Sequence, residues 1–196
     1  SFAVLLTLGL ALAQDAAHVA KKPRLHVIGA SVSGGFRGGP MTGAQSKMGI
    51  DLRNSVELAV AEWNQRGGVL GKKIEMLAGD DQADPKQAVS VANKFINQKA
   101  VAVVGHWNSS CSIPTSKYYS DANMVMISPA TTNPQFTLQG FKKIFRVCGT
   151  DDQQGRIAAA FVLKTLHPKR IAVIHDKTAY GQGLADFFQK ALGNGA

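Results

Sequence analysis

Short apolar segments alternate with longer amphipathic segments along most of the chain, and this alternation limits the possible folds more than any other feature. The short segments predict strands over residues 24–30, 73–80, 100–105, 124–128, 143–149 and 170–176. The longer segments predict helices over residues 50–66, 84–98, 109–122, 151–167 and 183–192. Apolar strands that alternate with helices are typical of a parallel sheet covered by helices on both faces, so we predict the doubly wound α/β class.

Local signals support this division of the chain. Asp84 and Pro85 open the second predicted helix as its N-cap and its first-turn proline. A glycine-rich segment over residues 31–49 reads as a loop between the first strand and the first helix.

A cluster of small polar residues follows the strand at residues 100–105, in the sequence GHWNSSCSIP. Ser109 lies where this strand gives way to a helix, and two interpretations of it stay open. Its hydroxyl can accept hydrogen bonds from backbone N–H groups of the helix and so cap it. Alternatively, the free N–H groups of the helix start and the Ser109 hydroxyl together bind an anion such as a carboxylate.

A second polar loop, ISPATTNP, follows the next strand. Here the Ala130 carbonyl and the Thr132 hydroxyl are acceptors, and acceptors suit a cationic ammonium group. In open α/β sheets, ligands bind at the carboxyl ends of the strands. An anion site and an ammonium site at neighbouring strand ends match a zwitterion, so we predict an α-amino acid as the ligand.

The motifs of the chain resemble a known family. MTGAQSKMG, DDQADPKQAVSVANK, VVGHWNSS, ISPATTNP and RIAVIHDKTAYGQGLA occur in this order. In combination they resemble the leucine/isoleucine/valine-binding proteins, which are type I periplasmic binding proteins of ABC transporters. The resemblance spans residues 24–196.

The resemblance implies two α/β lobes hinged around a cleft. In this arrangement Ser109 binds the ligand carboxylate, and Ala130 and Thr132 bind the ammonium. Tyr180 closes over the ligand from the second lobe, and Trp107 and Asn108 border the pocket. The implied protein is a monomer without cofactor or metal. It captures a branched-chain or related aliphatic amino acid and delivers it to an inner-membrane ABC permease. An amide- or urea-binding protein and a sensory module of the same fold remain the alternatives.

The domain organisation follows from the N-terminal sequence and from the resemblance. Residues 1–13 are apolar and end in an A-x-A site, so we interpret them as part of a cleaved signal peptide and expect a periplasmic protein. Residues 14–23 are then a linker, residues 24–149 the first lobe, and residues 150–196 the start of a second lobe that is truncated. Without a Cys after the leader, no lipid anchor is expected.

The chain departs from the family pattern in three places. One is that the remaining second-lobe strands, with an acidic partner expected for the ammonium, are expected beyond residue 196. The family often joins two loops by a cysteine pair, and Ala83 and Asn108 occupy those positions here. Cys111 and Cys148 do not replace that bridge, although two cysteines could pair in an oxidising compartment. The loop at residues 31–39 carries extra residues, and these leave the identity of the ligand open.

Other classes of function fit less well. The net charge is +9, but Lys and Arg occur in scattered pairs, which does not favour nucleic-acid binding. A G-x-S-x-G motif is absent, and we interpret His106 and His175 as structural, so no enzyme is predicted. The segment YGQGLAD carries Asp186 where a dinucleotide-binding motif has its third glycine. Three acidic residues at positions 80, 81 and 84 lack the spacing of a calcium loop and are expected in a solvated loop and a helix cap.

Overall fold

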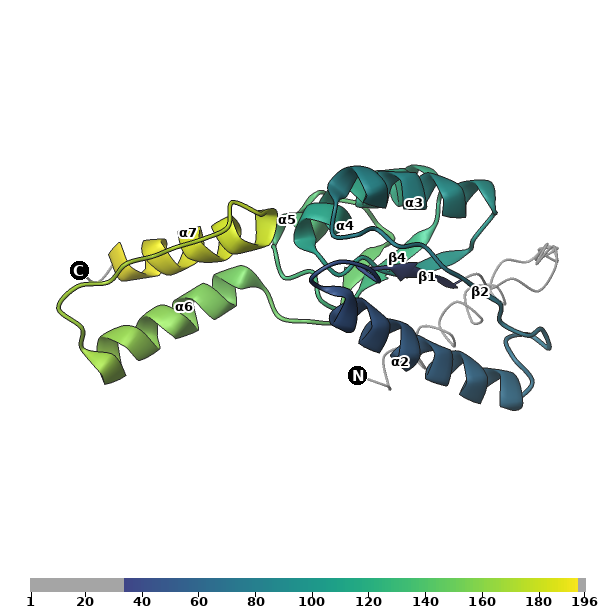
Figure 1. The fold of residues 1–196 in the computed structure, drawn as a ribbon, viewed down its shortest axis with the longest axis horizontal. Helices are drawn as coiled ribbons and strands as arrows, with labels where there is room; N and C mark the ends of the chain where they lie inside the picture. The colour runs from purple at the N-terminus through teal and green to yellow at the C-terminus, as the bar shows by residue number, and fades with distance from the viewer. Residues whose placement is uncertain (1–33, 194–196) are drawn as a thin grey trace.

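The computed structural model of the 196-residue chain describes residues 34–193, which form one parallel sheet and a helix pair beside it (Figure 1). The sheet has the order β2-β1-β3-β4-β5, and every pairing in it is parallel. Its strands are β1 (Gly34–Gly38), β2 (Met76–Leu77), β3 (Ala102–Gly105), β4 (Val125–Ser128) and β5 (Ile144–Arg146). The predicted α/β class is therefore confirmed.

Helices cover both faces of this sheet, as predicted. Figure 1 shows α2 (Ser46–Gln65) on one face and both α3 (Pro85–Asn97) and α4 (Ser109–Asp121) on the other. The short α5 (Gln135–Leu138) joins β4 to β5. Asp84 caps α3, because its carboxylate accepts hydrogen bonds from the backbone N–H groups of Lys86 and Gln87. The predicted cap and the proline that follows it are confirmed.

The core lies between the sheet and the helices α3 and α4. Aromatic, aliphatic and sulfur-containing side chains fill it, and the largest fully buried ones are Phe95, Val103, Tyr119, Met126 and Phe136. Burial of one such side chain contributes about 1.5–3 kcal/mol. This packing holds the carboxyl ends of β3 and β4 in fixed positions, and the polar loops of interest start at those ends.

Strand β1 corrects one prediction. Residues 31–49 were expected to be a loop, but Gly34–Gly38 pairs with β2 on one side and with β3 on the other. Side-chain periodicity gives little sign of this strand, because three of its five residues are glycines without side chains and the ladder is made by backbone groups. Helix α2 likewise starts at Ser46, four residues before the predicted start at Ile50.

The close approach of α2 to the segment after β1 requires a glycine. A Cβ atom added at Gly49 would lie 2.3 Å from the Pro40 carbonyl oxygen, which is a backbone atom that cannot move aside. Gly49 is buried on α2. Its lack of a side chain lets the helix pack directly against the backbone at Pro40.

Helices α6 (Asp151–Phe161) and α7 (Ala179–Gly193) form a pair that projects from one end of the sheet (Figure 1). A π-helical turn, η1 (Val162–Leu166), continues α6, and together they match the helix predicted over residues 151–167. The helix predicted over residues 183–192 also forms, as part of α7.

The strand predicted at residues 170–176 is wrong for the structure: this segment forms no strand, and Ile174 within it is 90% exposed. A strand needs a neighbour with which to share backbone hydrogen bonds, and no strand among residues 34–193 lies beside this segment. The apolar pattern of the segment predicts burial. The pattern does not show whether a neighbouring strand is available for pairing.

The strand predicted at residues 24–30, the linker at 14–23 and the leader at 1–13 lie outside the described residues. Among the helices that are described, none combines the length and the apolarity that crossing a membrane requires.

Candidate functional site

The polar loops after β3 and β4 meet at one backbone carbonyl. The backbone oxygen of His106 lies within hydrogen-bond distance of the hydroxyls of Ser112 (3.1 Å), Ser128 (2.9 Å) and Thr131 (3.4 Å). The Thr131 hydroxyl also lies 2.7 Å from that of Ser128 and 2.6 Å from that of Ser112. Each hydroxyl donates its single proton to one of these neighbours and accepts from another. All three side chains are fully buried. Most of the hydroxyl groups in these loops therefore hold the loops together.

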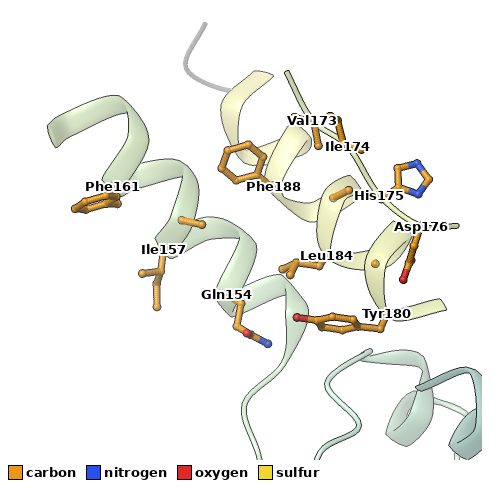
Figure 2. Close-up of a pocket in the computed structure, with 13 residues that line it drawn as sticks. Gln154, Ile157, Phe161, Val173, Ile174, His175, Asp176, Tyr180, Leu184 and Phe188 are labelled. Atoms are coloured by element: carbon orange, nitrogen blue, oxygen red, sulfur yellow. The ribbon is translucent and has the colours of Figure 1, made fainter. Parts of the chain in front are cut away.

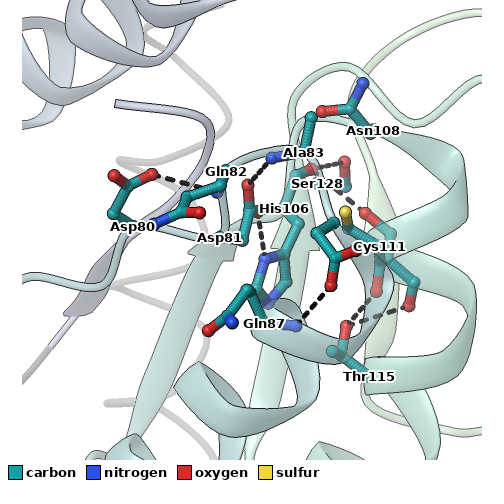
Figure 3. Close-up of polar contacts among 12 residues, drawn as sticks. Asp80, Asp81, Gln82, Ala83, Gln87, His106, Asn108, Cys111, Thr115 and Ser128 are labelled. Carbon is teal, nitrogen blue, oxygen red and sulfur yellow. Dashed lines mark hydrogen bonds and ion pairs between the residues drawn. The ribbon is translucent and has the colours of Figure 1, made fainter. Parts of the chain in front are cut away.

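The His106 side chain belongs to a second buried network (Figure 3). Its Nδ1 lies 2.6 Å from Asp81 Oδ2. Its Nε2 lies 3.2 Å from the Tyr119 hydroxyl. All three residues are fully buried. The structural interpretation of His106 is confirmed, whereas the solvated loop expected for Asp81 is wrong. An acidic side chain can be buried here because the imidazole 25 positions along the chain provides its partner.

The loop after β1 is attached to the same edge of the sheet by two side chains. Asp80 accepts from the backbone N–H of Met41 (2.9 Å) and from the Thr42 hydroxyl (2.6 Å). Asn108 donates from Nδ2 to the Gln45 side chain at 2.8 Å. Residues 39–45 therefore form a third wall beside the two hydroxyl loops.

Ser109 is the first residue of α4 and is 2% exposed. Of the two interpretations of Ser109, the helix cap is wrong: the N-cap position is Asn108, and no side chain caps the helix. The Ser109 hydroxyl instead accepts a long hydrogen bond, 3.4 Å, from the backbone N–H of Asn133 in the β4 loop. The first backbone N–H groups of a helix have no partner within the helix. At the start of α4 these N–H groups can therefore donate to another group.

Ala130 and Thr132 lie in the loop after β4, next to the buried network. The Thr132 hydroxyl oxygen is buried and has no hydrogen-bond partner among the described residues. Asn108 Oδ1 is a second such atom. Buried polar atoms without partners are rare in proteins and call for a missing ligand or water. Both belong to residues that the sequence singled out.

Arg146 of β5 holds the loop after β4 in place through hydrogen bonds to its backbone. Its guanidinium donates to the carbonyls of Thr131 (2.9 Å), Asn133 (2.9 Å) and Pro134 (3.2 Å), and to the Thr137 hydroxyl (2.7 Å). The five N–H donors of a guanidinium suit such a set of acceptors. The loop that carries Thr132 is therefore held in one conformation without using the Thr132 side chain.

Asn133 connects this loop to α7. Its Nδ2 donates to the Ala179 carbonyl at 2.7 Å, and its Oδ1 accepts from the backbone N–H of Gln135 at 2.9 Å. A Cβ atom added at Gly183 would lie 2.8 Å from Asn133 Nδ2, so this glycine lets α7 approach the loop. Asn133 thus joins the neighbourhood of Ser109 to the residue that precedes Tyr180.

Tyr180 lies in the first turn of α7 and is 44% exposed. It lines a cavity of about 1030 Å³ between α6 and α7. Figure 2 shows its hydroxyl directed across this cavity toward Gln154 on α6. Most of the wall is apolar, and its members include Ile157, Phe161, Val173, Ile174, Leu184 and Phe188.

The structure therefore brings Ser109, Ala130 and Thr132 to one edge of the sheet and joins them to the start of α7 through Asn133. Trp107 is half-buried in the same loop as Asn108. Sequence reasoning missed the supporting residues Ser112, Ser128, Thr131, Asn133, Arg146 and Asp151. Ser112, Ser128, Thr131 and Asn133 lie in the two quoted polar loops, which was the available signal, whereas Arg146 and Asp151 lie outside every quoted motif.

Asp151 opens α6 and is fully buried. Its backbone N–H donates to the Thr132 carbonyl at 3.0 Å, which places the two residues side by side. Burial raises the pKa of the Asp151 carboxyl, and the nearby Thr132 hydroxyl and Arg146 guanidinium oppose that shift only in part.

Cys111 and Cys148 are both free thiols in the structure, with Cys111 buried in α4. Burial raises the pKa of the Cys111 thiol to about 12. Within residues 34–193, no three His, Cys, Asp or Glu side chains gather closely enough to hold a metal ion.

Comparison with known proteins identifies the family. The sequence profile of a family described as periplasmic binding protein matches residues 39–195. The chain belongs to this family. A Leu/Ile/Val-binding protein homolog from Brucella abortus is 46% identical over 155 residues, which are 79% of this chain and 42% of the relative.

Solved structures of this family share the fold. A leucine-binding protein, LivK, from Thermotoga maritima has a TM-score of 0.73 and 31% identity, and the match covers 80% of this chain and 44% of that one. LivJ from Streptococcus pneumoniae, a branched-chain amino acid transporter substrate-binding protein solved with isoleucine, has a TM-score of 0.72 and 28% identity, over 78% of this chain and 44% of that one. The type I periplasmic binding protein fold is confirmed, and the chain spans less than half the length of these relatives.

Proposed function

We propose that the full-length protein is the periplasmic solute-binding component of an ABC transporter and that it captures a branched-chain or related aliphatic amino acid. Membership of the periplasmic binding protein family supports the solute-binding role and the periplasmic location. The names of the relatives from Brucella abortus and Thermotoga maritima support leucine, isoleucine or valine as ligands.

One observation carries the proposal: the buried Thr132 hydroxyl has no partner and lies on the loop next to the start of α4. The helix start offers free N–H donors and a partial positive charge, which suit a carboxylate. The hydroxyl lone pairs of Thr132 and the carbonyl of Ala130 suit an ammonium. In this proposal Ser109 binds the carboxylate, and Ala130 and Thr132 bind the ammonium of one amino acid.

Binding proceeds by hinge closure. The ligand first binds the polar loops of the first lobe, residues 24–149, and the lobe that starts at residue 150 then closes over it. Tyr180 covers the ligand from that side, and Trp107 and Asn108 border the pocket. The hydrogen bond from Asn133 to Ala179 ties the first turn of α7 to the ammonium loop, so closure and ligand contact are linked.

The remaining parts of the proposal concern export and partners. The apolar leader at residues 1–13 directs export and is removed. The mature protein works as a monomer without cofactor, has no catalytic role, and in its closed form delivers the ligand to an inner-membrane permease.

Calorimetric titration of the full-length protein without its leader tests the proposal. The ligands are leucine, isoleucine, valine, glutamate, acetamide and urea. We expect tight binding of a branched aliphatic amino acid and no binding of acetamide or urea. Binding of an amide or urea alone would contradict the ammonium role of Ala130 and Thr132. No binding of any ligand by a folded protein would contradict the proposed function.

A further inference from the structure

Asn133 is the side chain through which the loop after β4 bonds to α7. Its Nδ2 donates to the carbonyl of Ala179, the first residue of α7, at 2.7 Å. The contact joins residues that are 46 positions apart in the sequence. It also connects the polar loops at the edge of the sheet to the helix pair α6 and α7, which starts the second lobe of the proposed binding protein.

The orientation of the Asn133 amide is fixed by its own loop. Its Oδ1 accepts a hydrogen bond from the backbone N–H of Gln135 at 2.9 Å, and this bond leaves Nδ2 to donate toward α7. The backbone is held as well, because Arg146 donates to the Asn133 carbonyl at 2.9 Å. The loop therefore presents the amide donor to α7 in a fixed position.

Helix α7 has a glycine where it meets this donor. Gly183 follows Ala179 by four residues, so the two lie on the same face of the helix. A Cβ atom added at Gly183 would lie 2.8 Å from Asn133 Nδ2, which is too close for an ordinary contact. The missing side chain at Gly183 is therefore what lets the Asn133 amide reach the Ala179 carbonyl.

The helix pair is joined to the sheet at two places. One is the covalent connection between β5 and α6, residues 147–150, directly followed by a hydrogen bond from the Asp151 N–H to the Thr132 carbonyl (Figure 1). The other is the bond from Asn133 to Ala179 at the start of α7. Domains open and close by rotation about such short connections. Rotation of the helix pair about residues 147–150 would separate Asn133 from Ala179, so this bond opposes opening.

The backbone of Asn133 also contacts the proposed carboxylate site. Its N–H donates to the Ser109 hydroxyl oxygen at 3.4 Å. A hydroxyl that donates its proton to a ligand carboxylate still has lone pairs for this N–H. Contacts therefore lead from Ser109 through Asn133 to Ala179, and the Asn133 side chain is the part of this chain that crosses to α7.

We propose that Asn133 is a positioning residue that holds the helix pair over the bound amino acid and so sets how long the ligand stays bound. The inference rests on the proposed function. The Asn133 side chain acts through α7 and does not touch the ligand. Its bond to Ala179 forms after the ligand has bound to the first lobe, so the bond slows dissociation and leaves association unchanged.

Two variants of the full-length protein break the contact from its two sides. Asn133→Asp replaces the Nδ2 donor by an acceptor and keeps the oxygen that accepts from the Gln135 N–H. Gly183→Ala leaves the loop unchanged and places a methyl group against Nδ2. The second variant carries no new charge, so an effect common to both cannot come from charge.

Each variant has a matched control. Gln139→Glu makes the same change of amide to carboxylate, but the Gln139 amide donates to the Ser116 hydroxyl at 2.9 Å and has no bond to α7 among the described residues. Gly193→Ala adds a methyl group to the same helix, where no described atom lies within 4 Å of the added Cβ.

Stopped-flow fluorescence of leucine binding measures the two rate constants. We expect Asn133→Asp and Gly183→Ala each to raise the dissociation rate constant roughly three- to tenfold, the equivalent of one ordinary hydrogen bond. The association rate constant stays within about twofold, as is usual when affinity changes through dissociation. The double variant dissociates at most about twofold faster than the faster single variant, because both changes remove the same contact. The controls change neither rate constant.

Circular dichroism checks that each variant is folded, and Gly183→Ala carries the test if Asn133→Asp does not fold. An association rate constant that falls as much as the dissociation rate constant rises would make the contact a structural support only and overturn the inference. Unchanged dissociation, or faster dissociation in only one of two folded variants, would overturn it and leave the proposed function standing. If the unmodified protein binds no amino acid, the proposed function fails and the inference fails with it.

Discussion

The Nδ1 atom of His106 lies 2.6 Å from Oδ2 of Asp81, and both side chains are completely excluded from solvent. This contact joins the end of β3 to the loop that precedes α3. Removal of one partner leaves one buried polar atom of the other without a bond, which typically costs about 3–5 kcal/mol for such a pair.

We therefore expect Asp81→Ala to lower the free energy of unfolding by about 3–5 kcal/mol. The measurement is a urea unfolding curve followed by circular dichroism. Tyr119→Phe is the graded control, because it removes only the hydroxyl 3.2 Å from His106 Nε2 and should cost about 1 kcal/mol. Equal stability of the Asp81→Ala variant and the unmodified protein would show that the pair does not stabilise the fold.

The two hydroxyl groups proposed to contact the ligand should each affect affinity and spare stability. Ser109→Ala and Thr132→Val are each expected to weaken leucine binding by about 1–3 kcal/mol, the range for a hydrogen bond to a charged group. Calorimetric titration measures the affinity. Ser110→Ala on the same helix turn is the control and should bind as the unmodified protein does. A Ser109→Ala variant with unchanged affinity would rule out the carboxylate role of Ser109.

Arg146 should matter more through its geometry than through its charge. Arg146→Lys keeps the positive charge but cannot donate to the three carbonyls and the Thr137 hydroxyl at once. We expect this variant to lose about 1–3 kcal/mol of unfolding free energy, because partly buried acceptors are left without donors. Leucine affinity should fall as well, since the loop that carries Thr132 loosens. Unfolding curves and titrations that match those of the unmodified protein would contradict the role of Arg146 in holding the loop after β4.

Gly49 should not tolerate a methyl group. A Cβ atom there would lie 2.3 Å from the Pro40 carbonyl oxygen, so Gly49→Ala forces α2 away from the backbone at Pro40. Overpacking of this kind typically costs about 1–3 kcal/mol, and thermal unfolding measures it. Gly149→Ala is the matched control, because the nearest atom to its added Cβ is a side-chain oxygen at 3.6 Å. Equal melting temperatures for the two variants would be evidence against the close packing.

The two thiols should differ in reactivity. Burial raises the pKa of Cys111 to about 12, so at pH 8 almost none of it is the reactive thiolate. Burial also raises the pKa of Cys148, but this residue is only partly buried. We expect a thiol reagent at pH 8 to label Cys148 first in the native protein and both residues in urea, as read by peptide mass spectrometry. Faster native labelling of Cys111 would contradict its burial.

The helices and the meeting of the two polar loops followed from local sequence. Asp84 and Pro85 mark the start of α3 by their own chemistry, and parallel strands bring their carboxyl ends to one edge whatever the side chains are. The class of fold and the neighbourhood of Ser109, Ala130 and Thr132 were therefore predictable.

The errors have a common physical cause, which is that a partner distant in the sequence decides the outcome. Asp81 is buried because His106 faces it, and Gly34–Gly38 is a strand because β2 and β3 flank it. Residues 170–176 are apolar but have no neighbouring strand among the described residues. In the sequence, Asp151 is indistinguishable from an ordinary acidic residue in the first turn of a helix. Only its burial against α7 distinguishes it from Asp152.

The single carbonyl of His106 has a consequence for engineering new ligand specificity. Because the hydroxyls of Ser112, Ser128 and Thr131 all lie within hydrogen-bond distance of it, the backbone of both hydroxyl loops forms one rigid unit. Asn108 and the segment 39–45 are instead joined to each other by one side-chain bond. Randomised libraries directed at residues 41–45 and at Trp107 and Asn108 should therefore yield folded variants with altered ligands. Libraries directed at the three hydroxyl residues should yield mostly unfolded chains.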